Sequence, residues 1–152
     1  MDRFREPPAK GVLCDLLWAD PIEEIPENEN KAFESNTIRG CSWYFGYEAA
    51  DRFLSGNNLL TIIRAHEVEE EGYRMYRTRE STGFPSVVTV FSAPNFNDTW
   101  NNQACVIQLV DNQFNLRKFK VHSPVFILLC IFILLWDKTV CSSIARYIEI
   151  YV

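Results

Sequence analysis

Between residues 59 and 119 the chain carries five short runs rich in β-branched and aromatic residues, separated by polar turn residues. Such runs are typical of β-strands, because branched and aromatic side chains pack well on a pleated surface. We expect strands at 59–63, 73–77, 86–92, 104–110 and 114–119, the last two paired as a hairpin around Asp111-Asn112.

A short helix is expected ahead of these strands, over residues 46–55. Four apolar side chains at helical spacing would face inward, and Gly56 would end the helix. They are Ala49, Ala50, Phe53 and Leu54. The sequence therefore predicts a mixed α/β (α+β) protein.

His66 is one of only two histidines, and it follows the apolar run 59–63, which is expected to be a buried strand. A polar side chain just beyond such a strand is exposed at a sheet edge, where α/β folds gather reactive groups. Neutral imidazole is the commonest metal ligand, although a single His is more often an ordinary hydrogen-bonded residue. His66 is a candidate metal ligand, and both interpretations stay open at this point.

Four strings follow one another along the chain: Cys14–Pro21, Asn36–Ser42, Arg64–Glu67 and Phe91–Asp98. In this order they resemble the C-terminal half of the catalytic domain of the Ser/Thr phosphoprotein phosphatases. The strings at 2–9, 72–77 and 115–117 resemble the calcineurin A branch of that family. The resemblance implies a partial metallophosphatase β-sandwich with flanking helices over residues 1–120, followed by a divergent hydrophobic tail, residues 121–152.

The resemblance also implies roles for individual residues. His66 would be a ligand of a two-metal centre, of iron and zinc or of manganese, and Arg39 would bind the substrate phosphate. Trp18 and the loop with Asn95, Phe96 and Asp98 would line the substrate groove; Phe96 stands where the family usually has Tyr, losing a hydroxyl but keeping an aromatic wall. Two metals about 3.5–4 Å apart activate water and stabilise an in-line transition state, while Arg offers a charged fork for phosphate oxygens.

Most of the family's site is nevertheless absent from the sequence. The strings Gly-Asp-x-His-Gly, Gly-Asp-x-x-Asp-Arg and Gly-Asn-His-Glu, which supply most metal ligands, do not occur in the 152 residues. We therefore expect a fragment of a phosphatase whose complete parent hydrolyses phosphoserine and phosphothreonine in proteins, inactive by itself. A non-catalytic docking module and a non-functional partial product are the alternatives.

A docking role is suggested by Asn115, Leu116 and Arg117 on the last predicted strand. In calcineurin a similar string binds Pro-x-Ile-x-Ile-Thr peptides of substrates and regulators by strand addition. The neighbouring pocket positions would be Tyr73, Met75 and Phe114. An ordinary edge strand with an exposed Arg is the alternative.

Charge and cysteine usage restrict the partners and the compartment. The formal charge of −5 leaves no basic stripe for nucleic acid. The acidic cluster of Glu67, Glu69, Glu70 and Glu71 is interpreted as a solvated loop, with metal binding as the alternative. Five cysteines without a Cys-x-x-Cys pair are typical of free thiols, so we expect a cytoplasmic protein.

The tail contains thirteen consecutive uncharged residues, Pro124–Trp136. As a helix they would span about 20 Å, short of the roughly 30 Å of a bilayer core. They lack the polar face of the helix that binds calcineurin B, so that subunit is not an expected partner. Three hypotheses stay open: an alternative terminus or translated non-coding sequence, an interfacial membrane anchor, and a helix that docks in a partner or covers the exposed sheet.

Overall fold

A computed structural model describes residues 6–22, 31–111 and 113–121 of the chain. The chain divides into a unit of Met1–Phe119 and a unit of Lys120–Val152, and only residues 120 and 121 of the second are described. The hydrophobic run 124–136 therefore lies outside the described residues. Within the described part, no helix is long and apolar enough to cross a membrane.

Helix α1, Val12–Trp18, leads directly into the short strand β1, Asp20–Pro21. The helix ends at Ala19, which is extended (φ −70°, ψ 133°) and whose N–H bonds the carbonyl of Asp15. Pro21 favours this boundary, because helical geometry is disfavoured for the residue before a proline, here Asp20, and helices usually end at or before that residue. Asp20 is thereby held in a strand and is buried, with only 3% of its surface exposed.

Strand β1 belongs to a small sheet of order β1-β3-β2, in which β2 is Phe33–Ser35 and β3 is Trp43–Phe45. β1 and β3 run parallel, whereas β2 and β3 are antiparallel. These three strands were not predicted from the sequence. Runs of two or three residues carry too little pattern to be recognised, and they exist only because tertiary pairing holds them.

The expected helix at 46–55 is confirmed as α2, Tyr47–Gly56. Ala50 and Leu54, one turn apart, are buried as predicted. Phe53 contradicts the prediction, because 53% of its surface is exposed. It faces an open apolar cleft that also includes Leu16 and Phe33, and no described element closes that cleft.

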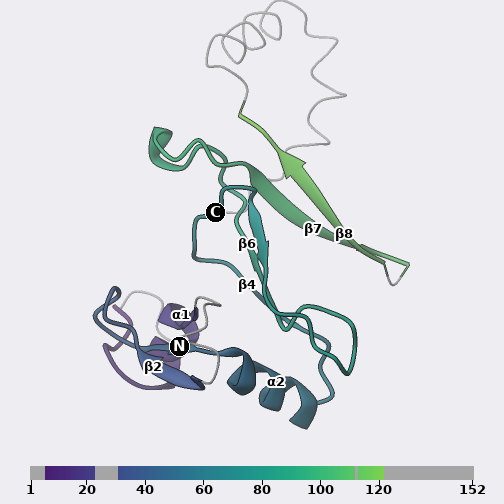
Figure 1. The fold of residues 1–152 in the computed structure, drawn as a ribbon. Helices are drawn as coiled ribbons and strands as arrows, with labels where there is room; N and C mark the ends of the chain where they lie inside the picture. Colours follow the sequence, from purple (N-terminus) through teal and green to yellow (C-terminus); the bar gives the residue numbers. More distant parts are fainter. Residues whose placement is uncertain (1–5, 23–30, 112, 122–152) are drawn as a thin grey trace, which may run out of the picture. The chain divides into compact units, whose positions relative to one another are not determined.

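A second sheet has the order β4-β6-β5, with β4 Ile62–Arg64, β5 Tyr73–Met75 and β6 Val87–Val90 (Figure 1). β4 runs parallel to β6, and β5 runs antiparallel to it. Because β4 and β6 are parallel, the loops that follow them leave from the same edge of the sheet. These loops begin at Ala65 and Phe91, so the sheet places two of the predicted site segments together.

The predicted hairpin is confirmed as β7, Ala104–Val110, and β8, Gln113–Phe119, drawn in green in Figure 1. Asp111 has a positive φ of 49° at the turn, and Asn112 lies outside the described residues. The Cys105 N–H bonds the Phe91 carbonyl at 2.9 Å, which ties the hairpin to the loop after β6.

Gly72 lies where the hairpin backbone approaches the sheet most tightly. Its φ is +78°, and a Cβ added there would be 2.5 Å from the carbonyl carbon of Ala104. Its own carbonyl accepts a bond from the Phe91 N–H at 2.8 Å. Only glycine allows both this conformation and this approach.

The core is a cluster of Ala50, Tyr76 and Val87, with Phe45 and Ile62 packed against it. These residues come from α2, both main sheets and the segment after β5, so the core joins helix and sheets. The prediction that residues 59–63 form a buried strand is wrong in part. The strand is shifted to 62–64, and Leu59, Leu60 and Ile63 are 46%, 52% and 47% exposed, because β4 lies at the edge of its sheet.

Candidate functional site

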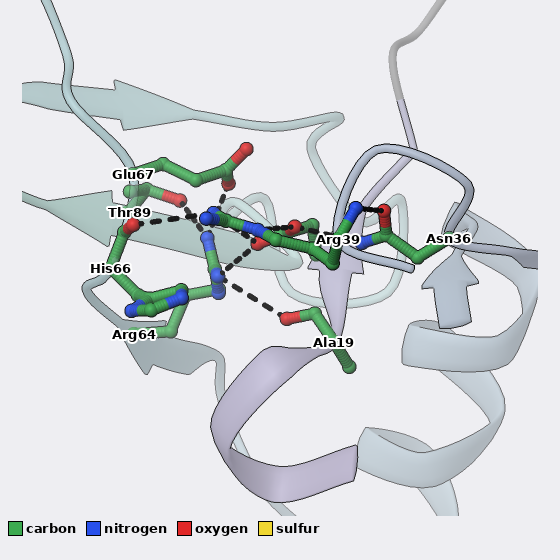
Figure 2. Close-up of polar contacts among 8 residues, drawn as sticks. Ala19, Asn36, Arg39, Arg64, His66, Glu67 and Thr89 are labelled. Carbon is green, nitrogen blue, oxygen red and sulfur yellow. Dashed lines mark hydrogen bonds and ion pairs between the residues drawn. The ribbon is translucent and has the colours of Figure 1, made fainter. Parts of the chain in front are cut away.

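The site is organised around the buried carboxylate of Asp20, which accepts hydrogen bonds from three side chains. Figure 2 labels the three donors, Asn36, Arg39 and Arg64. Asn36 Nδ2 donates to Oδ2 at 2.9 Å, Arg39 Nε donates to Oδ2 at 2.9 Å, and Arg64 Nη2 donates to Oδ1 at 2.7 Å. Burial alone would raise the Asp20 pKa. The hydrogen bonds from Arg39 and Asn36 and the charges of both arginines outweigh it, so the pKa of Asp20 lies below its ordinary value.

Arg39 is oriented by three neighbours. Its Nη2 also reaches Asp20 Oδ1 at 3.5 Å and the carbonyl of His66 at 3.4 Å. Asn36 Oδ1 accepts from the Arg39 backbone N–H at 3.0 Å, which fixes the turn that carries the side chain. The bond to Asp20 raises the Arg39 pKa, so the guanidinium stays charged.

Arg64, the last residue of β4, forms the opposite side of the cluster. Its Nη1 pairs with Glu67 and lies 3.4 Å from the Thr89 hydroxyl, and its Nη2 also bonds the carbonyl of Ala19 at 3.2 Å. Burial raises the Glu67 pKa, and the charge of Arg64 opposes that rise. Arg64 thus connects α1, β1, β4 and β6 at one point.

His66 occupies a strained backbone position at the carboxyl end of β4. Its φ is +83°, a region that non-glycine residues rarely adopt and that costs about 1–3 kcal/mol. The ring meets Trp18 edge to face, with centroids 4.9 Å apart. Loss of hydration lowers the His66 pKa, the charge of Arg39 lowers it further, and Asp20 opposes both, so the neutral imidazole that a metal requires is favoured.

Trp18 connects His66 to Arg39. Besides its contact with the His66 ring, it lies beneath the guanidinium of Arg39, whose Cζ is 5.9 Å from the ring centroid. The structure therefore brings together three of the predicted site residues, namely Trp18, Arg39 and His66.

The loop with Asn95, Phe96 and Asp98 follows β6, next to β4, and includes the 3-10 turn η2, Phe96–Asp98. Asn95 Nδ2 bonds Asp98 Oδ1 at 3.2 Å, and the Phe96 ring packs on Phe91 with centroids 5.4 Å apart. Within the described residues, this loop forms no hydrogen bond and no ring contact with the side chain of Arg39 or His66. The loop and His66 thus follow neighbouring parallel strands of one sheet.

The predicted docking residues lie on β5 and β8, away from the Asp20 cluster in the order of strands. Asn115 and Arg117 are exposed, while Phe114 and Leu116 alternate with them and are half-buried. Phe114 packs on Phe84, and Lys118 of the same strand lies 5.8 Å from the ring centroid of Tyr73. Tyr73 and β8 are therefore neighbours, as the hypothesis requires.

The described residues do not make up a two-metal centre. Within 6–22, 31–111 and 113–121, no group of three or more His, Cys, Asp or Glu side chains could hold a metal ion. The carboxylates near His66, Asp20 and Glu67, already accept arginine donors. The role of His66 as a metal ligand stays a prediction.

Three residues of this site were not predicted from the sequence, namely Asp20, Asn36 and Arg64. Arg64 gave a signal, because a charged residue in an apolar strand implies a partner of opposite charge. Asp20 gave a weaker one, since an Asp-Pro pair directly after a helical pattern places the carboxylate just beyond the helix end. The pairing itself was not visible, because Arg39 and Arg64 are 19 and 44 positions away from Asp20.

The chain is similar to several known proteins. The family model for calcineurin-like phosphoesterases matches residues 1–70. The serine/threonine-protein phosphatase 2B catalytic subunit A1 of Saccharomyces cerevisiae is 48% identical over 128 residues, covering 78% of this chain and 23% of that protein. Human serine/threonine-protein phosphatase 5 is 43% identical over 109 residues, covering 72% of this chain and 19% of that protein.

A solved structure of a Saccharomyces cerevisiae protein serine/threonine phosphatase, with similarity to human phosphatase 5, aligns with a TM-score of 0.61 at 31% identity. It covers 81% of this chain and 38% of that chain. The chain thus spans about a quarter or less of the length of the curated relatives named above. With the order of the four strings, these matches show that the chain belongs to the calcineurin-like serine/threonine protein phosphatases, of which it holds a segment.

Proposed function

We propose that this segment supplies the phosphate-binding arginine and one histidine metal ligand of a phosphatase that hydrolyses phosphoserine and phosphothreonine in proteins. The observation that carries the proposal is that the Arg39 side chain is held beside His66 by its hydrogen bonds to Asp20 and to the His66 carbonyl. The family implies phosphoprotein substrates and a dinuclear metal centre.

The guanidinium of Arg39 is held so that one of its nitrogens stays available. Asp20 takes Nε and Nη2, while Nη1 has no hydrogen-bond partner among the described residues. The side chain is 27% exposed, and Trp18 supports its plane. A charged, pre-oriented donor of this kind suits a phosphate oxygen, because little side-chain freedom is lost on binding.

The metal centre would be iron and zinc, or manganese, with His66 as the ligand that this segment contributes. When bound, such a pair supplies an activated water and charge stabilisation for phosphoryl transfer. By itself the chain is proposed to be inactive, because one ligand does not fix a two-metal site. Trp18 and the loop with Asn95, Phe96 and Asp98 are proposed to line the substrate groove.

A chimera tests this function directly. In the yeast catalytic subunit A1, the matched 128 residues are replaced by those of this chain, and hydrolysis of a phosphoserine peptide is measured with Mn²⁺. We expect activity similar to that of A1, falling at least a hundredfold in Arg39→Ala and His66→Ala. Arg52→Ala removes an exposed guanidinium on α2 and serves as the matched control.

A folded chimera without activity would contradict the proposal. So would full activity of the Arg39→Ala variant, since the phosphate would then be bound by other groups.

The second candidate function is peptide docking, favoured by the outer edge of β8. Within the described residues this strand pairs only with β7. The side chains of Asn115 and Arg117 are exposed along it, and Tyr73, Met75 and Phe114 would form the neighbouring pockets. Such an edge accepts an extended peptide through main-chain bonds.

Fluorescence anisotropy with a labelled Pro-x-Ile-x-Ile-Thr peptide measures this docking. Weak binding is expected, and the double variant Asn115→Ala with Arg117→Ala should abolish it. If the anisotropy of the peptide is the same with the wild type and the double variant at high protein concentration, β8 is an ordinary edge strand.

The compartment is proposed to be the cytoplasm, supported by the free thiols of Cys14, Cys41 and Cys105. Membrane contact through the tail is proposed only as a property of residues 124–136, which lie outside the described part of the chain.

A further inference from the structure

Helix α1 carries Trp18, yet little apolar packing holds this helix in place. Of its seven residues, Cys14 is the buried one, whereas Val12 and Leu16 are 76% and 79% exposed. The helix joins β1 at Ala19, which is extended, so α1 can pivot there while β1 stays paired with β3. Polar contacts of α1 therefore decide in which direction Trp18 points.

The turn that carries Arg39 contacts α1 at the right places to set this direction. The Ser42 hydroxyl donates to Asp15 Oδ1 at 3.0 Å. Asp15 and Trp18 are three positions apart, so their side chains lie on neighbouring parts of one helix face. The guanidinium of Arg39, from the same turn as Ser42, lies over the Trp18 ring. One turn thus fixes the helix through Asp15 and meets the ring of Trp18.

A second contact between the turn and α1 is weaker. The Cys14 thiol is hydrogen-bonded to the Cys41 thiol. Thiols are weak donors and weak acceptors, whereas a carboxylate acceptor makes a hydrogen bond stronger. Of these two bonds, the one between Ser42 and Asp15 therefore restrains α1 more.

Ser42 also adopts a backbone conformation that serine rarely uses. Its φ is +64°, and such strain persists only where the surroundings hold a residue in place. Its carbonyl accepts a bond from the Asn36 N–H at 3.1 Å, and its hydroxyl is bonded to Asp15. The strained backbone and the bonded side chain together place Ser42 against the helix.

Arg39 and Trp18 are held by different contacts. Arg39 is bonded to Asp20, which β1 carries and which Asn36 also bonds. Trp18 belongs to α1 and follows that helix. Loss of the bond between α1 and the turn should therefore displace Trp18 and leave Arg39 on Asp20.

We propose that Asp15 and Ser42 are a pair of positioning residues that hold Trp18 as a wall of the phosphopeptide groove. Both act through Trp18 and not on the phosphate. This inference rests on the proposed function for the groove itself, but the placement of Trp18 is measured without catalysis.

Fluorine NMR of the full chain, labelled with fluorinated tryptophan and kept in a mild detergent, measures the surroundings of Trp18. The variant Trp18→Phe assigns its signal. We expect Ser42→Ala and Asp15→Ala to shift this signal, whereas Asp15→Asn keeps an acceptor oxygen and should leave it in place. Ser35→Ala removes an exposed hydroxyl of β2 and is the matched control.

The variant Ser42→Gly separates positioning from stability. Glycine adopts a positive φ without strain, so the free energy of unfolding should be maintained although the hydroxyl is lost. The Trp18 signal should nevertheless shift as it does in Ser42→Ala. If the signal shifts only in variants that also lose stability, the pair has a structural role alone and the proposal is wrong.

Kinetics of the chimera with the yeast catalytic subunit A1 give a second readout. Ser42→Ala and Asp15→Ala should raise the KM for the phosphoserine peptide about fivefold and change kcat less than about twofold, because a groove wall binds substrate and transition state alike. The small substrate p-nitrophenyl phosphate does not fill the groove, so its hydrolysis should hardly change. Asp15→Asn should restore the KM for the peptide.

An unchanged Trp18 signal in Ser42→Ala and Asp15→Ala would overturn the proposal, as would equal losses of activity on the peptide and on p-nitrophenyl phosphate. If the signal shifts as expected while the chimera with wild-type residues is inactive, the proposed function is refuted. The placement of Trp18 by Asp15 and Ser42 would still stand.

Discussion

Asp20 shows how much of the site depends on one buried acceptor. Two arginines and an asparagine share its carboxylate. A buried ion pair contributes little net stability compared with apolar packing, but removing one partner leaves the other charges uncompensated. Asp20 is therefore a positioning residue for Arg39, and its loss should affect both the fold and phosphate binding.

The variant Asp20→Asn should lower the free energy of unfolding by about 2–3 kcal/mol at pH 7, the lower end of such effects because Arg39 is partly exposed. The pKa of Asp20 is lowered in the folded state. The carboxylate therefore stabilises the fold at every pH above the ordinary value of about 3.9, and this stabilisation disappears as the pH falls through the lowered pKa.

Urea unfolding of both proteins between pH 7 and pH 2.5 measures this difference. It should stay constant down to about pH 5 and shrink below about pH 4. A difference that grows on acidification would show that the Asp20 pKa is raised, contrary to this account.

At the level of single residues, the recognisable strings predicted Arg39, His66 and Trp18 as site residues. The structure places these three side chains together, and their roles stay predictions. The acceptor that orients them was not predicted, since pairing across 44 positions depends on how the strands are arranged. Strings identify side chains, whereas tertiary structure decides their partners.

Among the elements, those defined by a continuous pattern were predicted well. The hairpin β7–β8 follows from two alternating runs and a short turn, and α2 from its apolar spacing. The strands β1, β2 and β3 were missed because they hold two or three residues each. Their stability comes from pairing and burial rather than from local preference.

Arg79, in the segment after β5, links that segment to helix α2 by hydrogen bonds, and it is only 3% exposed. Its guanidinium bonds Asp51 at 2.6 Å, the Ser55 hydroxyl at 2.7 Å and the Leu59 carbonyl at 3.0 Å. Arg79→Met should cost about 1.5–3 kcal/mol in unfolding free energy, because these groups lose a charged donor but are exposed enough to be hydrated in its place.

The control is Arg52→Met on the same helix, whose side chain is 74% exposed and pairs with Glu48. It should change stability by about 0.5 kcal/mol or less. Chemical denaturation followed by tryptophan fluorescence measures the unfolding free energy of both variants. Similar losses would mean that Arg79 does not stabilise the packing of α2.

For the whole molecule, sequence reasoning gave the family but misjudged burial at β4 and Phe53. Periodicity predicts which side chains would be covered in a complete fold. It does not say whether the covering elements belong to the same segment, and here Ile63 and Phe53 stay about half exposed. The burial of these two residues was predicted wrongly because no described element covers them, although their apolar spacing was read correctly.

Catalysis by the isolated chain should be absent. With manganese or iron added, it should hydrolyse p-nitrophenyl phosphate no faster than His66→Ala, since one His is too few ligands for a two-metal site. Metal-dependent turnover that disappears in both His66→Ala and Arg39→Ala would refute this.

The solubility of the chain should be governed by its apolar surface. The run 124–136 contains no charge, and each large apolar side chain gains about 1.5–3 kcal/mol on burial. The full chain is thus expected to aggregate, bind vesicles or require a partner, whereas a chain ending at Lys120 should be more soluble. Sedimentation and vesicle flotation of both forms decide the matter; a full chain that stays monomeric in plain buffer would contradict it.

Gly72 has a consequence for how this protein tolerates mutation. The nearest obstacle to a side chain there is backbone, at 2.5 Å, and backbone cannot rotate aside as a side chain does. Any residue with a Cβ is therefore unfavourable at position 72, whatever the rest of its side chain. In a saturation library, alanine should be nearly as damaging there as tryptophan, because either side chain would push the segment before β5 away from the start of β7.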